Sequence, residues 1–401
     1  MTATHGLRIM HLITDLDIGG AETMLARLVA TMDRQRFDNV VVSMMTGGAL
    51  RPVIEGEGIR VTDLGMRRGM PNPMALFRLH RMLRGEQPDI LQTWLYHADL
   101  IGSLARRSAR TPVLAWNLRT SHLKLSRSTA LVVGVLARLA HLPDVVIFNS
   151  KAGQNVHTRM GYRPRRAEVI PNGIDVERFR PSGEARAQVR TELGLSAGTL
   201  LIGLIARYDP AKDHANFLRA AGMLVRTRRD IFFVLVGRGV DSKNAELEAA
   251  ISEQQLDERI CLLGERTDIP RLTAALDIAT SSSSGEGFPT VVGEAMACGV
   301  PCVVTDVGDS RLIVDETGRV VSARDPDALA SAWRELLEIG AKGRADLGAK
   351  ARDRIEKHYS LSAVVRRYEA LYEELAEDAQ LSRPHARHLP TYKYPGTHEP
   401  R

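Results

Sequence analysis

The sequence is poor in cysteine and has no apolar run long enough to span a membrane. Its three cysteines, Cys261, Cys298 and Cys302, lie in apolar segments typical of strands or helices. We interpret them as buried thiols rather than a disulfide framework, which fits a reducing cytoplasm. The longest apolar run, ALVVGVLA at 130–137, is far shorter than the roughly 20 residues of a membrane helix. We therefore expect a cytoplasmic protein, with peripheral contact to the inner face of the plasma membrane as an extension of that prediction.

Two further patterns are missing. The first residues, MTATHGLRIMHLITDL, lack the charged region, continuous apolar core and cleavage site of a signal peptide. Neither first-strand turn carries the G-x-G-x-x-G pattern, which disfavours nicotinamide-dependent oxidoreduction. The 401 residues, 44% of them apolar, are instead sufficient for two soluble domains that each bury a core.

Positive charge is concentrated in the first half. Residues 1–180 hold 25 Lys and Arg against 15 Asp and Glu, a net charge of +10, and the remainder holds 29 against 33, a net charge of −4. Nearly all these cations are Arg, and several, Arg106 and Arg166 among them, have no evident partner in the sequence. The pattern indicates an anionic partner, for which we expect a membrane surface and no nucleic acid; the alternative is a solvated basic face.

Short, nearly continuous apolar segments alternate with helical segments along both halves. Such strands are typical of a parallel sheet that is covered on both faces. The expected strands are 8–14, 39–45, 59–64, 89–94, 112–118, 144–150 and 167–170, then 199–206, 231–237, 259–264, 277–282, 302–306 and 318–321. The expected helices are 21–32, 75–85, 151–162, 212–228, 243–255, 268–276, 289–298 and 326–340. Right-handed crossovers then make each half an α/β, doubly wound, Rossmann-like domain.

The Pro- and Gly-rich segment PNGIDVERFRPSG marks the boundary between the domains. We expect a first domain at 1–178, a second at 179–360, a helix with apolar spacing at 361–380 and a disordered tail at 381–401. Two such domains in tandem place a cleft where the carboxyl ends of both sheets meet.

The stretch GEGFPTVVGEAMACGVPCVVTD, 285–306, holds two carboxylates around a helix start. Glu286 lies in the loop before the helix, and Glu294 lies about one turn inside it. A carboxylate can accept two hydroxyl groups, so this pair suits a polyhydroxylated ligand. The alternative is that Glu294 is a surface helix residue that pairs with an Arg.

The ends of this helix are also marked. Pro289 suits the first helical position, and Gly299 suits a left-handed stop. The backbone N–H groups around Gly287, Phe288 and Thr290 are then free to donate to a hydroxyl or an anion.

Two other pairs of residues point to the same cleft. Arg207 and Lys212 follow the first strand of the second half and form an anion site beside a helix start, or alternatively are ordinary loop charges. The pair Gly19 and Gly20 follows the first strand of the chain and allows a close backbone approach, although tight turns use such pairs too.

Together, IGGAE (18–22), VIPNGID (169–175), ARYDPAKDH (206–214) and the stretch 285–306 resemble the GT-B retaining glycosyltransferases of family four, or glycosyl transferases group 1. The resemblance covers residues 8–378 and is most specific in the second half. It implies a GT-B fold and the transfer of a sugar from a nucleotide diphosphate sugar to an acceptor, with retained configuration and neither metal nor cofactor. It also implies that the helix at 361–378 returns to the first domain.

The same resemblance implies roles for single residues. Glu294 would hold the ribose hydroxyls of the donor, and Glu286 the hydroxyls of its sugar. The backbone of Gly287, Phe288 and Thr290, around Pro289, would assist Glu286. Arg207 and Lys212 would neutralise the leaving diphosphate, and Gly19 and Gly20 would let the first domain close over it.

The acceptor side departs from the family pattern. Members often carry a histidine after the fifth strand, where this sequence has Arg119, with His122 slightly beyond. His97, after the fourth strand, is the candidate for contact with the donor sugar, and a structural role is the alternative. Trp94 and Trp116 either pack in the core or stack on a sugar or lipid.

These observations predict a glycosyltransferase, with a UDP-linked donor as the family-level expectation, that acts on a lipid-linked or polysaccharide acceptor of the cell envelope. Segment 127–142, apolar with basic flanks, is either a core helix or a membrane-surface helix. Two alternatives remain open: an epimerase or phosphorylase-like enzyme of the same fold, and a non-catalytic partner that binds nucleotide sugars.

Overall fold

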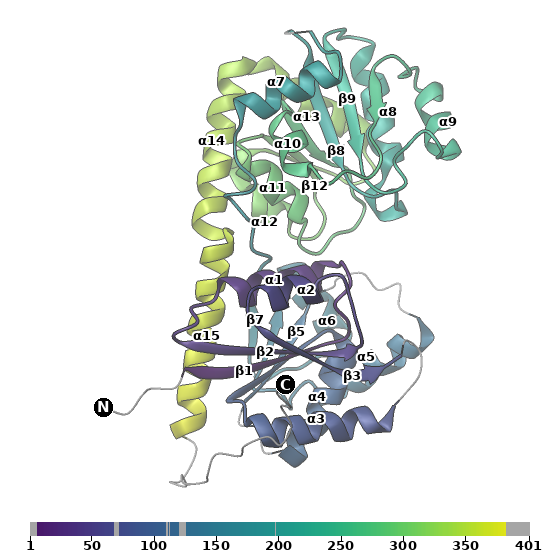
Figure 1. The fold of residues 1–401 in the computed structure, drawn as a ribbon. Coiled ribbons are helices and arrows are strands. Elements are labelled where there is room, and N and C mark those ends of the chain that lie inside the picture. The colour runs from purple at the N-terminus through teal and green to yellow at the C-terminus, as the bar shows by residue number, and fades with distance from the viewer. Residues whose placement is uncertain are drawn as a thin grey trace, which may run out of the picture.

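The structure is a computed structural model that describes residues 6–67, 72–109, 111, 113–119, 126–196 and 198–381. His122 and the tail beyond residue 381 lie outside the described residues. The chain forms two α/β bodies, each built around one parallel sheet, with a long column of two helices along one side (Figure 1).

The first sheet has seven parallel strands in the order β3-β2-β1-β4-β5-β6-β7. These strands are β1 (Leu7–Ile13), β2 (Phe37–Met45), β3 (Arg60–Met66), β4 (Ile90–Trp94), β5 (Val113–Leu118), β6 (Val145–Phe148) and β7 (Ala167–Val169). The helices of this body are α1 (Gly20–Thr31), α2 (Arg51–Gly56), α3 (Pro73–Glu86), α4 (Tyr96–Ala109), α5 (Arg127–Leu139) and α6 (Lys151–Arg159).

The second sheet has six parallel strands in the order β10-β9-β8-β11-β12-β13. These strands are β8 (Leu200–Ile205), β9 (Ile231–Val236), β10 (Ile260–Leu262), β11 (Ile278–Ser281), β12 (Cys302–Thr305) and β13 (Arg319–Val321). The helices that follow residue 180 are α7 (Gly183–Glu192), η1 (Pro210–Lys212), α8 (His214–Val225), α9 (Ala245–Glu253), α10 (Ile269–Ala274), α11 (Thr290–Ala297), α12 (Ser310–Val314), η2 (Asp315–Thr317), α13 (Pro326–Glu338), α14 (Gly340–His358) and α15 (Leu361–Leu381).

Successive residues of a strand point to opposite faces of the sheet. Both faces of each sheet are apolar here, and helices cover both. In β1, Ile9 and Ile13 join the core under α1, α2 and α15, whereas Met10 and Leu12 join the core under α3, α4 and α5. The second sheet is divided in the same way. The predicted α/β class with two doubly wound, Rossmann-like domains is confirmed.

The order of the strands reverses at one place in each sheet, between β1 and β4 and between β8 and β11. In open α/β sheets, ligands bind outside the carboxyl ends of the strands at this reversal. The segments that leave β1, β4, β8 and β11 therefore line the ligand edge of each sheet. Gly19 and Glu286 lie in two of these loops, His97 lies in the first turn of α4, and Lys212 is the last residue of η1.

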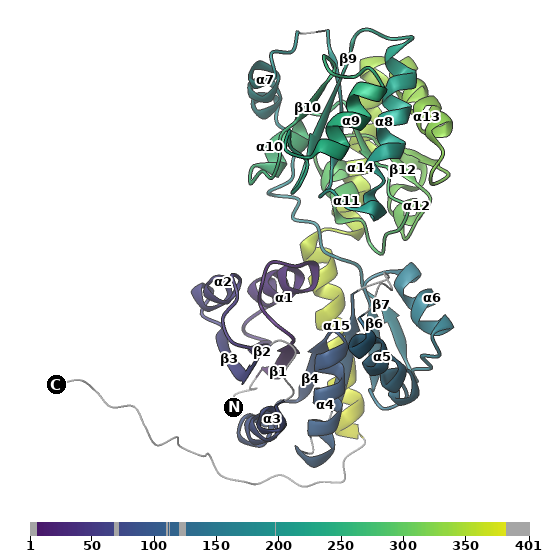
Figure 2. The same ribbon diagram turned by 90° about the vertical axis from the view of Figure 1, so that its right-hand side faces the viewer.

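The chain passes between the domains twice, and the two passages run side by side. Ile174 pairs with Ser360 in an isolated parallel bridge, through hydrogen bonds from Ile174 N–H to Tyr359 O and from Leu361 N–H to Ile174 O. A Cβ on Gly173 would lie 2.9 Å from Cα of Leu361, so glycine is required for this approach. Figure 2 shows α15 leaving this point along the first domain.

Several smaller predictions are decided by the fold. Arg106 pairs with Asp144, and Arg166 pairs with Glu168 and Glu374, so these two arginines do have partners. The three cysteines are free, as expected, but only Cys298 and Cys302 are buried; Cys261 is partly exposed. Within the described ranges, no helix has both the length and the apolar content to cross a membrane.

Candidate functional site

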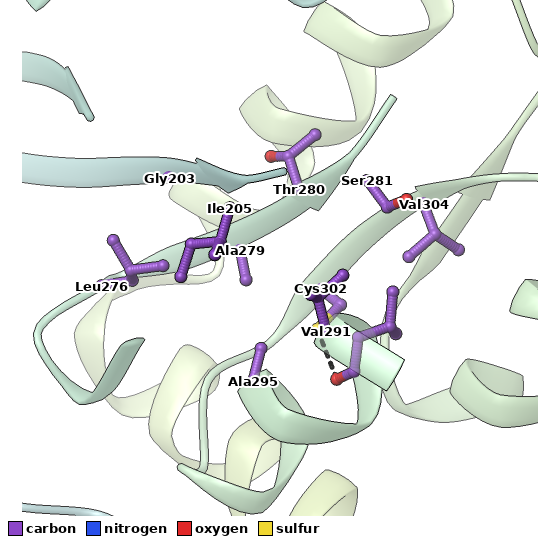
Figure 3. Close-up of a pocket in the computed structure, with 11 residues that line it drawn as sticks. Gly203, Ile205, Leu276, Ala279, Thr280, Ser281, Val291, Ala295, Cys302 and Val304 are labelled. Atoms are coloured by element: carbon purple, nitrogen blue, oxygen red, sulfur yellow. Dashed lines mark hydrogen bonds between the residues drawn. The ribbon is translucent and has the colours of Figure 1, made fainter. Parts of the chain in front are cut away.

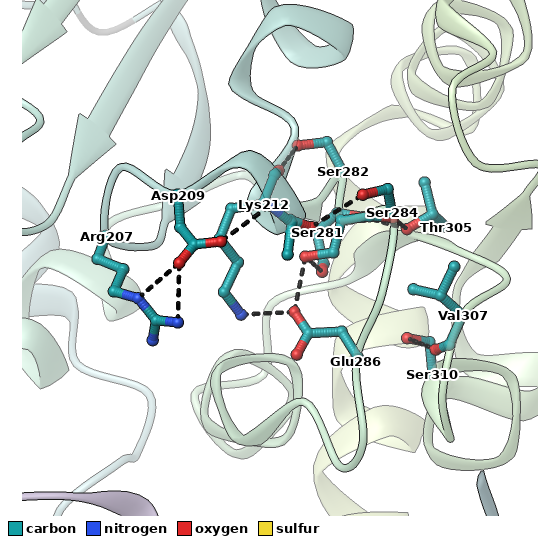
Figure 4. Close-up of polar contacts among 12 residues, drawn as sticks. Arg207, Asp209, Lys212, Ser281, Ser282, Ser284, Glu286, Thr305, Val307 and Ser310 are labelled. Atoms are coloured by element: carbon teal, nitrogen blue, oxygen red, sulfur yellow. Dashed lines mark hydrogen bonds and ion pairs between the residues drawn. The ribbon is translucent and has the colours of Figure 1, made fainter. Parts of the chain in front are cut away.

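Two loops of the second domain, after β8 and after β11, are fastened to each other. Ser282 Oγ donates to the carbonyl oxygen of Lys212 over 2.9 Å, and Ser284 N–H donates to Ala211 O over 2.8 Å. Thr305, at the end of β12, donates from Oγ1 to Ser283 O over 2.6 Å. The serine run SSSS at 281–284 therefore sets the position of the residues that follow it (Figure 4).

Lys212 and Glu286 form an ion pair at this junction. Lys212 Nζ donates to Glu286 Oε1 over 2.6 Å, and Ser283 Oγ donates to the same oxygen over 2.6 Å. The side chains of Lys212 and Glu286 are only 18% and 11% exposed, which orders the pair more strongly than a surface ion pair. The sequence predicted both residues for the site but did not predict that they bind each other.

Arg207 lies at the same loop and, among the described residues, keeps its Nη1 group free to bind an anion. Its Nε and Nη2 donate to Asp209 Oδ2 over 3.3 and 3.1 Å, and its side chain is 55% exposed. Asp209 Oδ1 accepts from the N–H of Ala211 over 2.9 Å and so caps η1. This N–H group, and Arg207 after it, lower the pKa of Asp209. Sequence analysis missed Asp209, although an Asp before Pro is a common start for such a turn.

The loop before α11 is held from several sides. Gly287 O accepts from Asp309 N–H over 2.9 Å, and the ring of Phe288 is buried 5.8 Å from that of Tyr359. Among the described residues, the N–H groups of Gly287, Phe288 and Thr290 have no protein acceptor, which leaves them available to a ligand.

One helix boundary differs from the prediction. Pro289 is the N-cap residue of α11, with φ −75° and ψ 88°, and Thr290 is the first helical residue. The prediction that Pro289 occupies the first position was wrong by one residue because its ψ is not helical. Gly299 does adopt a left-handed conformation after the helix, at φ +71°.

Glu294 faces the first domain from α11 without a bonded partner. Burial raises its pKa to about 7, an effect that Arg27 of α1 and Arg178 oppose from a distance. No donor among the described residues lies within hydrogen-bonding distance of its carboxylate, so the alternative of a structural pair with an Arg is wrong. A half-buried carboxylate without a donor is costly unless a ligand satisfies it.

The paired glycines lie at the first turn of α1. Gly19 is the N-cap residue with φ −150°, an extended conformation that any residue adopts, so a tight turn does not explain the pair. A Cβ on Gly20 would have no heavy atom within 4 Å. The helix start is therefore open on this side.

His97 lies in the first turn of α4, directly after β4. It is half-buried, and burial lowers its pKa, so the imidazole is neutral near pH 7. The preceding Leu95 has φ +72°, a left-handed conformation that is strained for a branched residue. This turn directs the start of α4 to the edge of the sheet beside β1.

Arg119 is a buried structural link rather than an open acceptor-site residue. It is 9% exposed, donates from Nη1 to Tyr368 Oη of α15 over 3.0 Å, and donates from Nη2 to Asn172 Oδ1. Asn172 in turn donates from Nδ2 to Thr290 Oγ1 over 3.1 Å. A chain of hydrogen bonds therefore joins α15, the first passage between the domains and the start of α11.

The two tryptophans belong to the core. Trp94 and Trp116 are fully buried, and their Nε1 groups donate to His11 Nδ1 and Ser103 Oγ over 3.3 and 3.0 Å. The alternative that they stack on a sugar or lipid was wrong, since neither ring reaches the surface.

A small cavity behind α11 is not the ligand site. It is lined mostly by apolar residues of β8, β11, β12 and α11, together with Thr280 and Ser281, and Figure 3 shows Cys302 and Val304 on its wall. Its volume of ≈ 10 Å³ is at the lower limit for one water molecule. Across the described residues, no group of three or more His, Cys, Asp or Glu side chains is arranged to hold a metal ion.

Comparison with known proteins gives the family. The model described as Glycosyl transferases group 1 matches residues 199–338, and the model described as Glycosyltransferase Family 4 matches residues 18–178. The lipopolysaccharide core biosynthesis mannosyltransferase LpsB of Rhizobium meliloti (strain 1021) is 31% identical over 375 residues, which cover 87% of this chain and 97% of LpsB.

Two further proteins extend this result. The UDP-Gal:alpha-D-GlcNAc-diphosphoundecaprenol alpha-1,3-galactosyltransferase of Escherichia coli is 26% identical over 269 residues, 64% of this chain and 68% of that enzyme. The structure of Anabaena Alr3699/HepE in complex with UDP superimposes with a TM-score of 0.80 at 23% identity, over 92% of this chain and 100% of that one. The chain therefore belongs to the family 4, group 1 glycosyltransferases and has their GT-B fold, as its motifs indicated.

Proposed function

We propose that this glycosyltransferase moves a hexose from a UDP-linked donor to a lipid-linked or polysaccharide acceptor in cell-envelope glycan synthesis, with retained configuration and without a metal ion. The observation that carries the proposal is the Lys212–Glu286 ion pair, with Lys212 Nζ 2.6 Å from Glu286 Oε1, beside Arg207 and the start of α11. These groups offer cations, hydroxyl acceptors and free N–H donors at one sheet edge.

The two cations, Arg207 and Lys212, would stabilise the leaving diphosphate. When the bond between the sugar and the diphosphate breaks, negative charge grows on the diphosphate, and Arg207 and Lys212 stabilise it more in the transition state than in the ground state. Two fixed cations beside a helix start can supply this charge without a metal.

The two carboxylates would bind the ribose and the sugar of the donor. Glu294, which lacks a donor group in the protein, would accept the two ribose hydroxyls. Glu286, held by Lys212 and Ser283 through Oε1, would accept sugar hydroxyls through Oε2. Neutral His97, across the domain interface at the end of β4, would contact the sugar from the first domain.

Retained configuration at the transferred sugar is compatible with a reaction in which the acceptor attacks on the same face from which the diphosphate leaves. In such a step a phosphate oxygen of the donor takes the proton of the acceptor hydroxyl while that hydroxyl attacks, so no protein nucleophile is required. Support for the acceptor class comes from two relatives, one named for lipopolysaccharide core synthesis and one for a diphosphoundecaprenol acceptor. The basic first half agrees with an acceptor that is anchored in an anionic membrane.

Calorimetric titration of UDP, GDP and ADP, with divalent metals chelated, tests the donor site. We expect UDP to bind and Glu294→Ala to weaken it by about 1–3 kcal/mol. Glu253→Ala, an exposed glutamate of α9 in the same domain, is the control. Equal binding by Glu294→Ala and the parent would refute the assigned role of this carboxylate, and tighter binding of GDP would replace uridine in the proposal.

A further inference from the structure

Helices α3, α4 and α5 form one layer over the first sheet, on the face opposite α1 and α15. Their inner sides share one core, and neighbouring helices of the layer touch each other. Figure 2 shows the three helices together on the first domain. The outer side of this layer has no protein cover within the described residues.

This outer side gathers the exposed apolar residues of the protein. Ten large apolar side chains are strongly exposed in the described ranges; five of them lie on these three helices, and a sixth, Leu142, lies three residues after the end of α5. Their exposed fractions run from 37% to 72%, and they are Met74, Phe77, Leu104, Leu131, Val135 and Leu142. Single exposed apolar residues are ordinary, but a concentration on one face marks an interaction surface.

The apolar residues alternate with arginines along the helices. On α5, Leu131 and Val135 are one turn apart, and Arg127 and Arg138 lie on the same side of the helix. On α3, Met74 and Phe77 are followed on the same face by two further arginines, Arg81 and Arg84. Helices α3 and α5 therefore each present an exposed stripe that contains both apolar and basic side chains.

Acidic residues neutralise little of the charge on this surface. The three helices contain seven Arg but only two acids, Glu86 and Asp99, and one of these arginines, Arg106, pairs with Asp144 beyond the helices. Glu86 pairs with Arg60 over 2.6 Å, and Asp99 is fully buried. Among the described residues, Arg81, Arg84 and Arg127 have no carboxylate partner. The positive charge of the layer is thus available to an external anion.

The layer also adjoins the ligand edge of the sheet. Helices α3, α4 and α5 follow β3, β4 and β5, so each begins at the carboxyl edge, where His97 lies in the first turn of α4. Phe77 lies one turn from the start of α3, and Leu131 one turn from the start of α5. A molecule held on this surface is therefore near the reacting groups.

We propose that the outer face of α3, α4 and α5 docks on an anionic phospholipid bilayer. Arginines bind lipid phosphates while Phe77, Leu131 and their neighbours enter the boundary between headgroups and acyl chains. Nucleic acid, the other polyanion, would be bound by the arginines but gives no reason for six protruding apolar side chains. The inference rests on the proposed lipid-linked acceptor, which this surface would bring to the active site directly from the bilayer.

Flotation of the full chain with phosphatidylcholine vesicles, with and without phosphatidylglycerol, tests the surface. We expect binding only to the anionic vesicles, weakened by salt. Leu131→Ser/Val135→Ser and, separately, Arg81→Ser/Arg84→Ser/Arg127→Ser should each lower the bound fraction about tenfold. These positions are at the surface, so thermal melting should be unchanged in both variants.

A basic groove on the other side of the molecule supplies the control. It has a volume of ≈ 610 Å³, and Lys357 and Arg366 are among the residues that line it. Of these residues none is a strongly exposed large apolar one. Lys357→Ser/Arg366→Ser should bind vesicles like the parent chain, and an equal loss in this variant would overturn the proposal. So would full binding by the Leu131→Ser/Val135→Ser variant, or displacement of the vesicles by DNA.

Titration with UDP separates this proposal from the proposed function. If UDP binds and vesicles do not, the surface assignment fails and the donor-site assignment remains. If vesicles bind as predicted and no nucleoside diphosphate does, the proposed function fails while the lipid surface stands.

Discussion

The carboxylate of Asp309, in the second domain, caps a helix of the first domain that begins at Lys151. Lys151 N–H donates to Asp309 Oδ2 over 2.8 Å, and the next N–H, that of Ala152, donates to Oδ1 over 2.9 Å. The acid therefore complements the positive end of α6. The N–H of Asp309 also donates to Gly287 O. Asp309 therefore links the contact between the two domains to the loop before α11.

Replacing Asp309 with Ala should loosen this contact. We expect a loss of about 1–2 kcal/mol in the free energy of unfolding, because two part-buried N–H groups at the start of α6 lose their charged acceptor. Asp306→Ala, which removes an ion pair with exposed Arg311, is the control and should cost under about 1 kcal/mol. Urea unfolding measures both, and small-angle scattering should show a larger radius of gyration for Asp309→Ala only. Equal effects of the two substitutions would contradict the capping role.

Substitutions in the Lys212–Glu286 ion pair should affect the stability of the protein and its catalytic turnover differently. Lys212→Met should lower kcat/KM by about 10²–10³ and also destabilise the protein, since Glu286 stays buried without its cation. The double variant Lys212→Met/Glu286→Gln should regain stability but not turnover. Steady-state kinetics and thermal melting test this, with exposed Lys243→Met as the control. Recovery of turnover in the double variant would show that the pair is structural only.

Glu294 predicts opposite pH trends for stability and for binding. Burial raises its folded pKa from 4.5 to about 7. The stabilising effect of the protonated form is fully present below about pH 4.5 and is lost as the pH rises through about 7. Above that pH and without ligand, the Glu294→Gln variant should have a free energy of unfolding about 2–3 kcal/mol higher than that of the parent.

Binding should change in the other direction. Ribose hydroxyls need the ionised carboxylate as acceptor, so UDP affinity should rise from about pH 6 to about pH 8 in the parent and stay flat in Glu294→Gln. Urea unfolding without ligand and calorimetry with UDP measure the two trends. If the variant and the parent show the same pH profiles, the carboxylate does not titrate in this range.

His97 should act on the sugar and not on the nucleotide. His97→Gln is expected to lower kcat by about 10²-fold or more while leaving the affinity for free UDP unchanged. Burial keeps the pKa of His97 below its ordinary value, so its loss should not remove a pH limb between about pH 7 and 8. Exposed His141→Gln serves as the control. Weaker binding of free UDP by His97→Gln would argue against a contact limited to the sugar.

Some elements carried enough local signal to be predicted from the sequence. The thirteen strands of the described residues match apolar segments because a strand buried on both faces must be apolar along its length. The end of α11 was predicted because Gly299 can adopt a left-handed conformation and Pro301 cannot continue a helix.

Helix α14 gave no comparable signal and was missed. Its sequence, GAKGRADLGAKARDRIEKH, is mostly polar and contains three glycines. The helix exists because of its neighbours: Gly348 allows close approach to the carbonyl of Gly299, and Arg344 donates to the carbonyl oxygens of Leu336 and Leu337 at the end of α13. Such contacts are invisible to periodicity, because they depend on residues that are distant in the chain.

The sequence by itself determined the two-domain α/β class and the residue types of the candidate site, because strand burial, helix stops and charged loop residues are local features. Only the tertiary structure decided that Lys212 pairs with Glu286, that Arg119 reaches Thr290 through Asn172, and that Asp309 caps a helix of the other domain. These contacts join residues from 53 to 158 positions apart. Their geometry is set by the packing of whole domains, and no pattern within a single segment encodes it.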